Sequence, residues 1–157
     1  THSDKVVIMD RGRIQQIGSP VEIYSHPANR FVAGFMGKAN FLEATVKELG
    51  ESEVVLEYCG KTITAPRWDK SIKTGDEATI VVRPESVFLD PPREDLIEGT
   101  VVNSVYFGSQ MLYEVEMPDG KLLQAEIADP QDHLLFAKGH SVGLSFKSRS
   151  LHVLAKE

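Results

Sequence analysis

One pair of charged residues has the types and spacing to recognise a charged partner. Arg83 and Glu85 stand on either side of Pro84, so an extended backbone presents both side chains on one face. A guanidinium binds anions through paired N–H groups, and a carboxylate accepts hydrogen bonds or pairs with a cation. Pro84 has no N–H and ends strand pairing on one side. The alternative is an exposed charge pair at a strand end, which contributes less than about 1 kcal/mol to stability.

Motifs for catalysis are missing from this sequence. It has no glycine-rich loop ending in Lys and Ser or Thr that would enclose phosphates, no Gly-x-Ser-x-Gly turn and no His-Glu-x-x-His helix. The histidines stand in unlike surroundings, and the single cysteine, Cys59, forms neither a cysteine-rich zinc site nor an intrachain disulfide. We therefore expect no catalytic residues, no metal site and no cofactor site in this chain.

Composition excludes two further classes. The chain has 157 residues, of which 41% are hydrophobic, which is enough for one or two folded domains. Its 23 acidic residues exceed its 17 basic ones, for a net charge of -6. This balance argues against nucleic-acid binding and against an electrostatic membrane anchor, because both need basic surfaces. No apolar run is long enough to span a bilayer, so direct membrane insertion is not expected.

The first forty residues predict a small hairpin followed by two short helices. Two β-type runs flank Gly12, which provides the positive φ of a tight turn. Ser19 is the expected N-cap of the first helix and Asn29 that of the second, which ends at Gly37. The apolar face of this second helix comprises Phe31, Val32, Phe35 and Met36. A segment this small cannot bury such a face by itself, so we expect a larger domain upstream.

From residue 40 onward, short β-type runs alternate with turn residues, a pattern typical of a small barrel or sandwich. The sequence shows no long amphipathic helix in this region. The strands are expected at residues 41–49, 53–58, 61–65, 78–83, 86–89, 96–106, 110–117, 121–127, 141–147 and 151–154.

The β-rich part also repeats its own pattern. Residues 42–46 match residues 97–101, and a second matched pair of segments lies near the end of each copy. We therefore expect a mainly β fold with two related, five-stranded, OB-like barrels, at about 39–90 and 96–157. The proline-containing segment between them reads as a linker or an exposed crossover.

Four segments carry a resemblance to a known family. They are residues 3–37, which read SDKVVIMDRGRIQQIGSPVEIYSHPANRFVAGFMG, residues 81–87, VVRPESV, residues 105–110, VYFGSQ, and residues 142–154, VGLSFKSRSLHVL. The first resembles the end of the nucleotide-binding domain in the ATPase subunits of ABC importers of the maltose, polyamine and ferric-iron type. The others are similar to segments of the TOBE-type regulatory tails of such subunits. Their order and spacing make the resemblance specific over nearly the whole chain.

The resemblance implies an organisation and a set of partners. Residues 1–38 would be the end of the nucleotide-binding domain, and residues 39–157 the regulatory domain. The parent subunit would bind ATP and Mg and couple ATP hydrolysis to uptake of a polyamine, iron or sugar. Two copies would pair through their regulatory domains, and permease subunits would hold them, cytoplasmic, at the inner face of the membrane. Arg83 and Glu85 become candidate partner contacts.

One alternative stays open. A stand-alone TOBE-type module would bind an oxyanion such as molybdate or tungstate, and Gly108 and Ser109 would offer it backbone N–H groups. Binding of single-stranded nucleic acid would need basic and aromatic residues interleaved on one face, which the sequence does not show. The pair Thr1-His2 resembles the threonine and switch histidine of importer ATPases, but it adjoins Ser3 without the family's intervening segment. His2 is therefore assigned no role.

Overall fold

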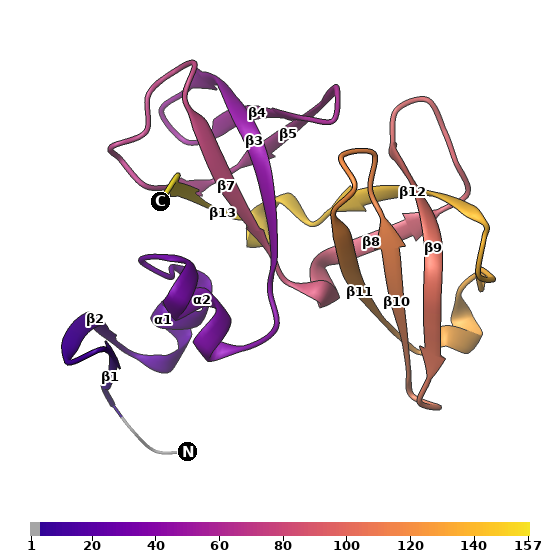
Figure 1. Ribbon diagram of the computed structural model, residues 1–157, viewed down its shortest axis with the longest axis horizontal. Helices are drawn as coiled ribbons and strands as arrows, with labels where there is room; N and C mark the ends of the chain where they lie inside the picture. The colour runs from indigo at the N-terminus through magenta and orange to yellow at the C-terminus, as the bar shows by residue number, and fades with distance from the viewer. Residues whose placement is uncertain (1–3) are drawn as a thin grey trace.

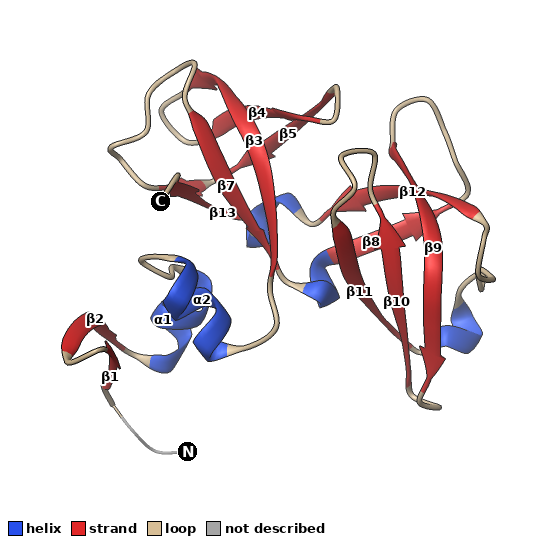
Figure 2. Cartoon of the chain, viewed as in Figure 1, coloured by secondary structure: helices blue, strands red, loops and turns tan. Residues whose placement is uncertain are grey.

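The computed structural model describes residues 4–157, and the pair Thr1-His2 lies outside them. The described chain forms one two-stranded hairpin, two short helices and two larger β-sheets that lie side by side (Figure 1). Strands dominate, and loops or 3-10 turns connect them (Figure 2). The expected fold class, mainly β with two OB-like sheets after a hairpin and two helices, is confirmed.

The hairpin at the start of the chain consists of β1 (Val6–Asp10) and β2 (Arg13–Gly18), paired antiparallel. Its turn has positive φ at Arg11, 53°, and at Gly12, 77°. Glycine suits the second position because it has no Cβ to clash in the left-handed region. The turn therefore lies where the sequence predicts it.

The two helices begin at the predicted caps. Helix α1 (Pro20–Ser25) starts after Ser19, whose hydroxyl accepts a hydrogen bond from the Glu22 N–H at 3.2 Å. Helix α2 (Arg30–Met36) starts after Asn29, whose side-chain oxygen accepts one from the Val32 N–H at 3.0 Å. In α2, Val32 and Ala33 are buried, whereas Phe35 remains 64% exposed. The predicted apolar face of α2 is thus only partly covered by this chain.

The first large sheet forms a nearly closed barrel. Its strand order is β5-β4-β3-β7-β13-β6. Of the strands in this sheet, only β6 was not predicted from the sequence, because two residues are too few to show an alternating pattern. The strands are β3 (Asn40–Leu49), β4 (Val54–Tyr58), β5 (Lys61–Ala65), β6 (Arg67–Trp68), β7 (Glu77–Val82) and β13 (His152–Ala155).

The second large sheet is a half-barrel with the order β11-β10-β9-β12-β8. The segment 129–140 leads from β11 back to β12, and its Phe136 packs edge-on against the core residue Tyr113. The strands are β8 (Val87–Asp90), β9 (Ile97–Tyr106), β10 (Gln110–Glu116), β11 (Leu122–Ala128) and β12 (Ser141–Phe146).

The two sheets share one strand order but exchange their last strands. The run β5-β4-β3-β7 in the first sheet corresponds to β11-β10-β9-β12 in the second. After β7 the chain crosses to the second sheet as β8, and after β12 it returns to the first as β13. Neither sheet is therefore built from residues 39–90 or 96–157 alone. The domain boundaries at 1–38 and 39–157 stay a prediction.

The two crossings are hydrogen-bonded to each other. Each contains a 3-10 turn, η1 (Pro84–Ser86) on the way out and η3 (Ser148–Ser150) on the way back. The hydroxyls of Ser86 and Ser150 lie 2.8 Å apart, and the N–H of Lys147 donates to the Ser86 carbonyl at 2.9 Å. These bonds satisfy polar groups where the chain changes sheets, as buried backbone requires.

A further pair of hydrogen bonds joins the sheets at the start of β3. The buried side chain of Asn40 donates to the Gln124 carbonyl and accepts from the Gln124 N–H, both at 2.8 Å. Asn40 thereby occupies backbone groups of β11 that no strand pairs within residues 4–157. With the exchanged strands and one continuous apolar core, it holds the two sheets in a fixed relative position.

Candidate functional site

Arg83 lies at the junction between the helices and both large sheets. Its side chain follows β7 and is 5% exposed. One terminal nitrogen, Nη1, donates to the carbonyls of Ala33, Gly37 and Lys38 at 2.8, 3.1 and 3.1 Å. The other, Nη2, donates to the Tyr24 carbonyl at 3.1 Å. We call the arrangement of Arg83, the carbonyls that it contacts, and the neighbouring Tyr24 and Glu85 the Arg83 junction.

The geometry of the helices explains why a cation stands there. The carbonyls of Tyr24 and Ala33 lie in the last turns of α1 and α2, where no N–H further along the helix can pair with them. These carbonyls also form the negative ends of the helix dipoles. The planar guanidinium of Arg83 has several donors in fixed directions and can serve all of these acceptors together. It therefore joins both helix ends to the end of β7.

An aromatic ring and a carboxylate complete the Arg83 junction. The Arg83 guanidinium carbon lies 4.2 Å from the centroid of the Tyr24 ring, which is a favourable cation–π distance. The Tyr24 hydroxyl donates to Glu85 Oε2 at 2.6 Å. Burial and this hydrogen bond raise the pKa of Tyr24 to about 12. Burial lowers the pKa of Arg83, although an arginine keeps its charge at neutral pH.

The structure thus brings Arg83 and Glu85 together around Tyr24, and the groups that they contact belong to the same chain. A role for either residue in contacting another protein stays a prediction. Tyr24 was not singled out from the sequence. It lies 61 positions from Glu85, and one tyrosine on a short helix gives no local signal of such a contact.

Gly108 and Ser109 lie elsewhere, in the exposed turn that joins β9 to β10 at the lower end of that hairpin in Figure 1. Gly108 has a φ of +80°, a conformation that favours glycine. The N–H of Ser109 already donates to the Phe107 carbonyl at 2.9 Å, and the Ser109 carbonyl accepts from the Asp129 N–H. An oxyanion site at this turn stays a prediction. Of the two backbone N–H groups that it would need, that of Ser109 already donates a hydrogen bond inside the turn.

A second contact between the helices and the first sheet centres on His152. Its ring lies 5.9 Å from that of His26, centroid to centroid, at an angle of 66°. Nδ1 of His152 and Nε of Arg67 are buried and have no hydrogen-bond partner among the described residues. Burial, His26 and Arg67 together lower the pKa of His152 to about 4, and the nearby Asp69 opposes this shift. The neutral imidazole is therefore the form that fits this contact.

Residues 4–157 lack two other kinds of feature. Within this range, no three histidine, cysteine, aspartate or glutamate side chains are grouped so that they could share a metal ion. None of the helices described there has the length and apolar character needed to cross a membrane.

Substitution of the buried arginine tests the Arg83 junction. We expect Arg83→Met to lower the free energy of unfolding by about 3 kcal/mol, because four carbonyls lose their donor in a buried place. Lys147→Met, at the exposed position that corresponds in the second sheet, should cost little. Urea unfolding followed by circular dichroism measures both, and equal costs for the two variants would contradict the role given to Arg83.

The contact at His152 predicts a pH dependence. Between pH values of about 6.5 and 4, the unfolded chain binds a proton at His152 that the folded chain does not, so the free energy of unfolding falls as the pH falls. We expect His152→Gln to flatten this slope and the exposed His133→Gln to keep it. Urea unfolding across this pH range gives the slopes, and identical slopes for wild type and His152→Gln would refute the assignment.

Comparison with known proteins finds a matching domain and similar proteins. Residues 80–154 match the TOBE domain. The chain is 39% identical over 156 residues to the spermidine/putrescine import ATP-binding protein PotA of Ruegeria pomeroyi, covering 98% of the chain and 42% of that protein. It is 34% identical over 152 residues to the Fe(3+) ions import ATP-binding protein FbpC of Brucella abortus, covering 97% of the chain and 41% of that protein. The chain thus spans about two fifths of these relatives.

A solved structure agrees with the fold. The cytoplasmic molybdate-binding protein ModG, crystallised with molybdate bound, superposes with a TM-score of 0.60 at 19% identity, covering 74% of this chain and 96% of that one. At this identity the likeness concerns the fold alone. A TOBE domain and similarity to importer ATP-binding proteins along nearly the whole length of the chain support a C-terminal, TOBE-type regulatory part of an ABC importer ATPase.

Proposed function

We propose that this chain is the regulatory and dimerisation region of the ATP-binding subunit of an ABC importer. The parent subunit would bind ATP and Mg and couple ATP hydrolysis to uptake of a polyamine or of ferric iron, the solutes in the names of its relatives. Permease subunits would hold it in the cytoplasm at the inner face of the membrane. The observation that carries the proposal is an apolar surface that this chain leaves open.

That surface covers the hairpin and both helices. Hydrophobic side chains there are between 38% and 76% exposed. Exposed apolar side chains concentrated in one segment of a chain indicate a surface that packs against another protein or domain. Its members are Val7, Met9, Ile14, Ile17, Val21, Phe31 and Phe35. The rest of a nucleotide-binding domain is the partner that the family similarity supplies.

The Arg83 junction gives this surface a mechanical role. It fixes the C-terminal ends of α1 and α2 to the end of β7, and the exchanged strands fix β7 to the second sheet. A movement of the nucleotide-binding domain would therefore carry both sheets with it.

Pairing of two copies through these sheets would keep two nucleotide-binding domains close to each other. Tethering of this kind raises their effective concentration, so the ATP-bound pair re-forms without diffusion. The regulatory region would thus act on ATP hydrolysis without holding a catalytic residue.

The stand-alone oxyanion-binding module is the second candidate. The turn at Gly108 and Ser109 and the likeness in fold to ModG are compatible with it. A stand-alone module has no use for an exposed apolar hairpin and helices, however, so we rank it below the importer subunit.

A charged substitution on the exposed apolar surface distinguishes the importer subunit from the stand-alone module. In this chain alone, Ile14→Glu and the control Leu135→Glu should each change the free energy of unfolding by less than about 0.5 kcal/mol, because the two side chains are 57% and 56% exposed. In the full-length subunit, Ile14→Glu should lower stability by about 2 kcal/mol and reduce ATP hydrolysis, because it buries a charge against the ATPase domain.

Leu135→Glu should leave both properties of the full-length subunit unchanged. If the two variants have equal stability and equal ATP hydrolysis in the full-length protein, the hairpin surface has no partner domain. This result would contradict the proposed function.

A further inference from the structure

A groove at the meeting point of the helices and both sheets gathers positive charge. It has a volume of about 390 Å³. Arg30 at the start of α2, Lys38 in the segment before β3 and Lys121 immediately before β11 line it. Its described lining contains no aspartate or glutamate. In a chain with a net charge of -6, three cations from three separate segments form a local positive field.

Two lysines provide most of this charge. The Arg30 guanidinium is paired with Glu43 and also donates to Thr79, so its charge is partly neutralised. Lys121 donates one hydrogen bond to the Phe41 carbonyl at 2.9 Å, which fixes the ammonium at the groove and leaves two of its three N–H groups for another acceptor. Lys38 is exposed and has no ion-pair partner within residues 4–157.

Part of the lining of the groove is apolar. It includes Ala39, the half-buried ring of Phe41 and the side chain of Leu122, which is 49% exposed. The Arg30 guanidinium carbon lies 4.9 Å from the centroid of the Phe41 ring and covers one side of it. An apolar floor with a few polar groups at the rim is the usual composition of a small-molecule site, and roughly 300–1,000 Å³ is the usual volume.

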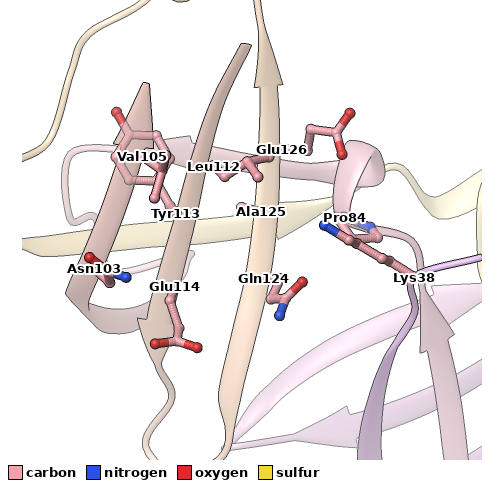
Figure 3. A pocket seen from close by; sticks show the side chains of 10 residues that line it. All are labelled: Lys38, Pro84, Asn103, Val105, Leu112, Tyr113, Glu114, Gln124, Ala125 and Glu126. Atoms are coloured by element: carbon pink, nitrogen blue, oxygen red, sulfur yellow. The ribbon is translucent and has the colours of Figure 1, made fainter. Parts of the chain in front are cut away.

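The surroundings limit the size of what can bind. Lys38 and Gln124 also line an adjoining cavity, where Glu114 and Glu126 project from β10 and β11 (Figure 3). The side chain of Lys38 extends toward β11 in this view, and Lys38 lines both the acidic cavity and the basic groove. A long polyanion or an extended acidic protein surface would meet these carboxylates, whereas a small ligand would not.

We propose that this groove binds a small organic anion, with a phosphate or carboxylate group at Lys38 and Lys121 and an apolar body on Phe41 and Leu122. Such a ligand would contact the helical segment through Arg30 and Lys38 and the second sheet through Lys121 and Leu122. Its binding would add a bridge beside the Arg83 junction, where Arg83 donates to the carbonyls of Gly37 and Lys38. The inference does not depend on the importer function.

Titration of the ¹⁵N-labelled chain with phenyl phosphate tests the site by nuclear magnetic resonance. Phenyl phosphate should shift the amide signals of residues 38–41 and 121–124 and bind more tightly than inorganic phosphate or phenol, because each of these offers only one of the two contacts. Benzoate in a parallel titration shows whether a carboxylate or a phosphate fits better. The double variant Lys38→Gln/Lys121→Gln should bind phenyl phosphate about fivefold or more weakly, as expected for the loss of two exposed charge contacts.

The control is Lys70→Gln/Lys138→Gln, which removes the same charge from lysines outside the groove and should bind as the wild type does. Leu122→Ser should weaken phenyl phosphate but leave inorganic phosphate unchanged. The proposal is overturned if the Lys38/Lys121 variant binds as tightly as the control variant. It is equally overturned if the shifted signals lie on the apolar hairpin, residues 6–18, instead of on the groove.

Discussion

The fixed position of two helix ends around one buried guanidinium is the constraint on which this structure depends. Short helices such as α1 and α2, of six and seven residues, are not stable by themselves in water. Here Arg83 donates to their terminal carbonyls, stacks on Tyr24 and stands next to Glu85, which accepts from the same tyrosine. A buried charge is tolerated only when such partners surround it. The helices, and the hairpin before them, are therefore oriented by a residue that belongs to the sheets.

The exchange of strands makes the two sheets one mechanical unit. If β8 and β13 remained with their own halves, the sheets would be joined by flexible connections alone. Instead β8 pairs in the second sheet and β13 pairs in the first. The two crossing segments are hydrogen-bonded to each other through Ser86 and Ser150. Arg83 directly precedes η1, the outward crossing. The residue that orients the helices thus stands where the chain passes from the first sheet to the second, so a force on the helices reaches both sheets.

Local sequence patterns predicted the helices and strands well, but they could not predict contacts between residues far apart in the sequence. The caps at Ser19 and Asn29 and every strand longer than two residues follow from short-range rules of capping and alternation. The exchange of β8 and β13 could not be predicted, because their residues alternate in the same way whichever sheet they join. The sequence singled out Arg83 and Glu85, but their contacts with Tyr24, and that of His26 with His152, join residues at least 59 positions apart.

Native-state hydrogen exchange at increasing urea concentration tests most directly whether the helices and sheets form one unit. The account predicts that the protected amides of α2 and those of β7 reach the same free energy of opening and the same denaturant dependence, because Arg83 joins them in one cooperative unit. Opening of α2 at a much lower free energy, with little denaturant dependence, while β7 stays protected would contradict it. The helices would then be loosely attached, and movement of a neighbouring domain would not be transmitted to the sheets.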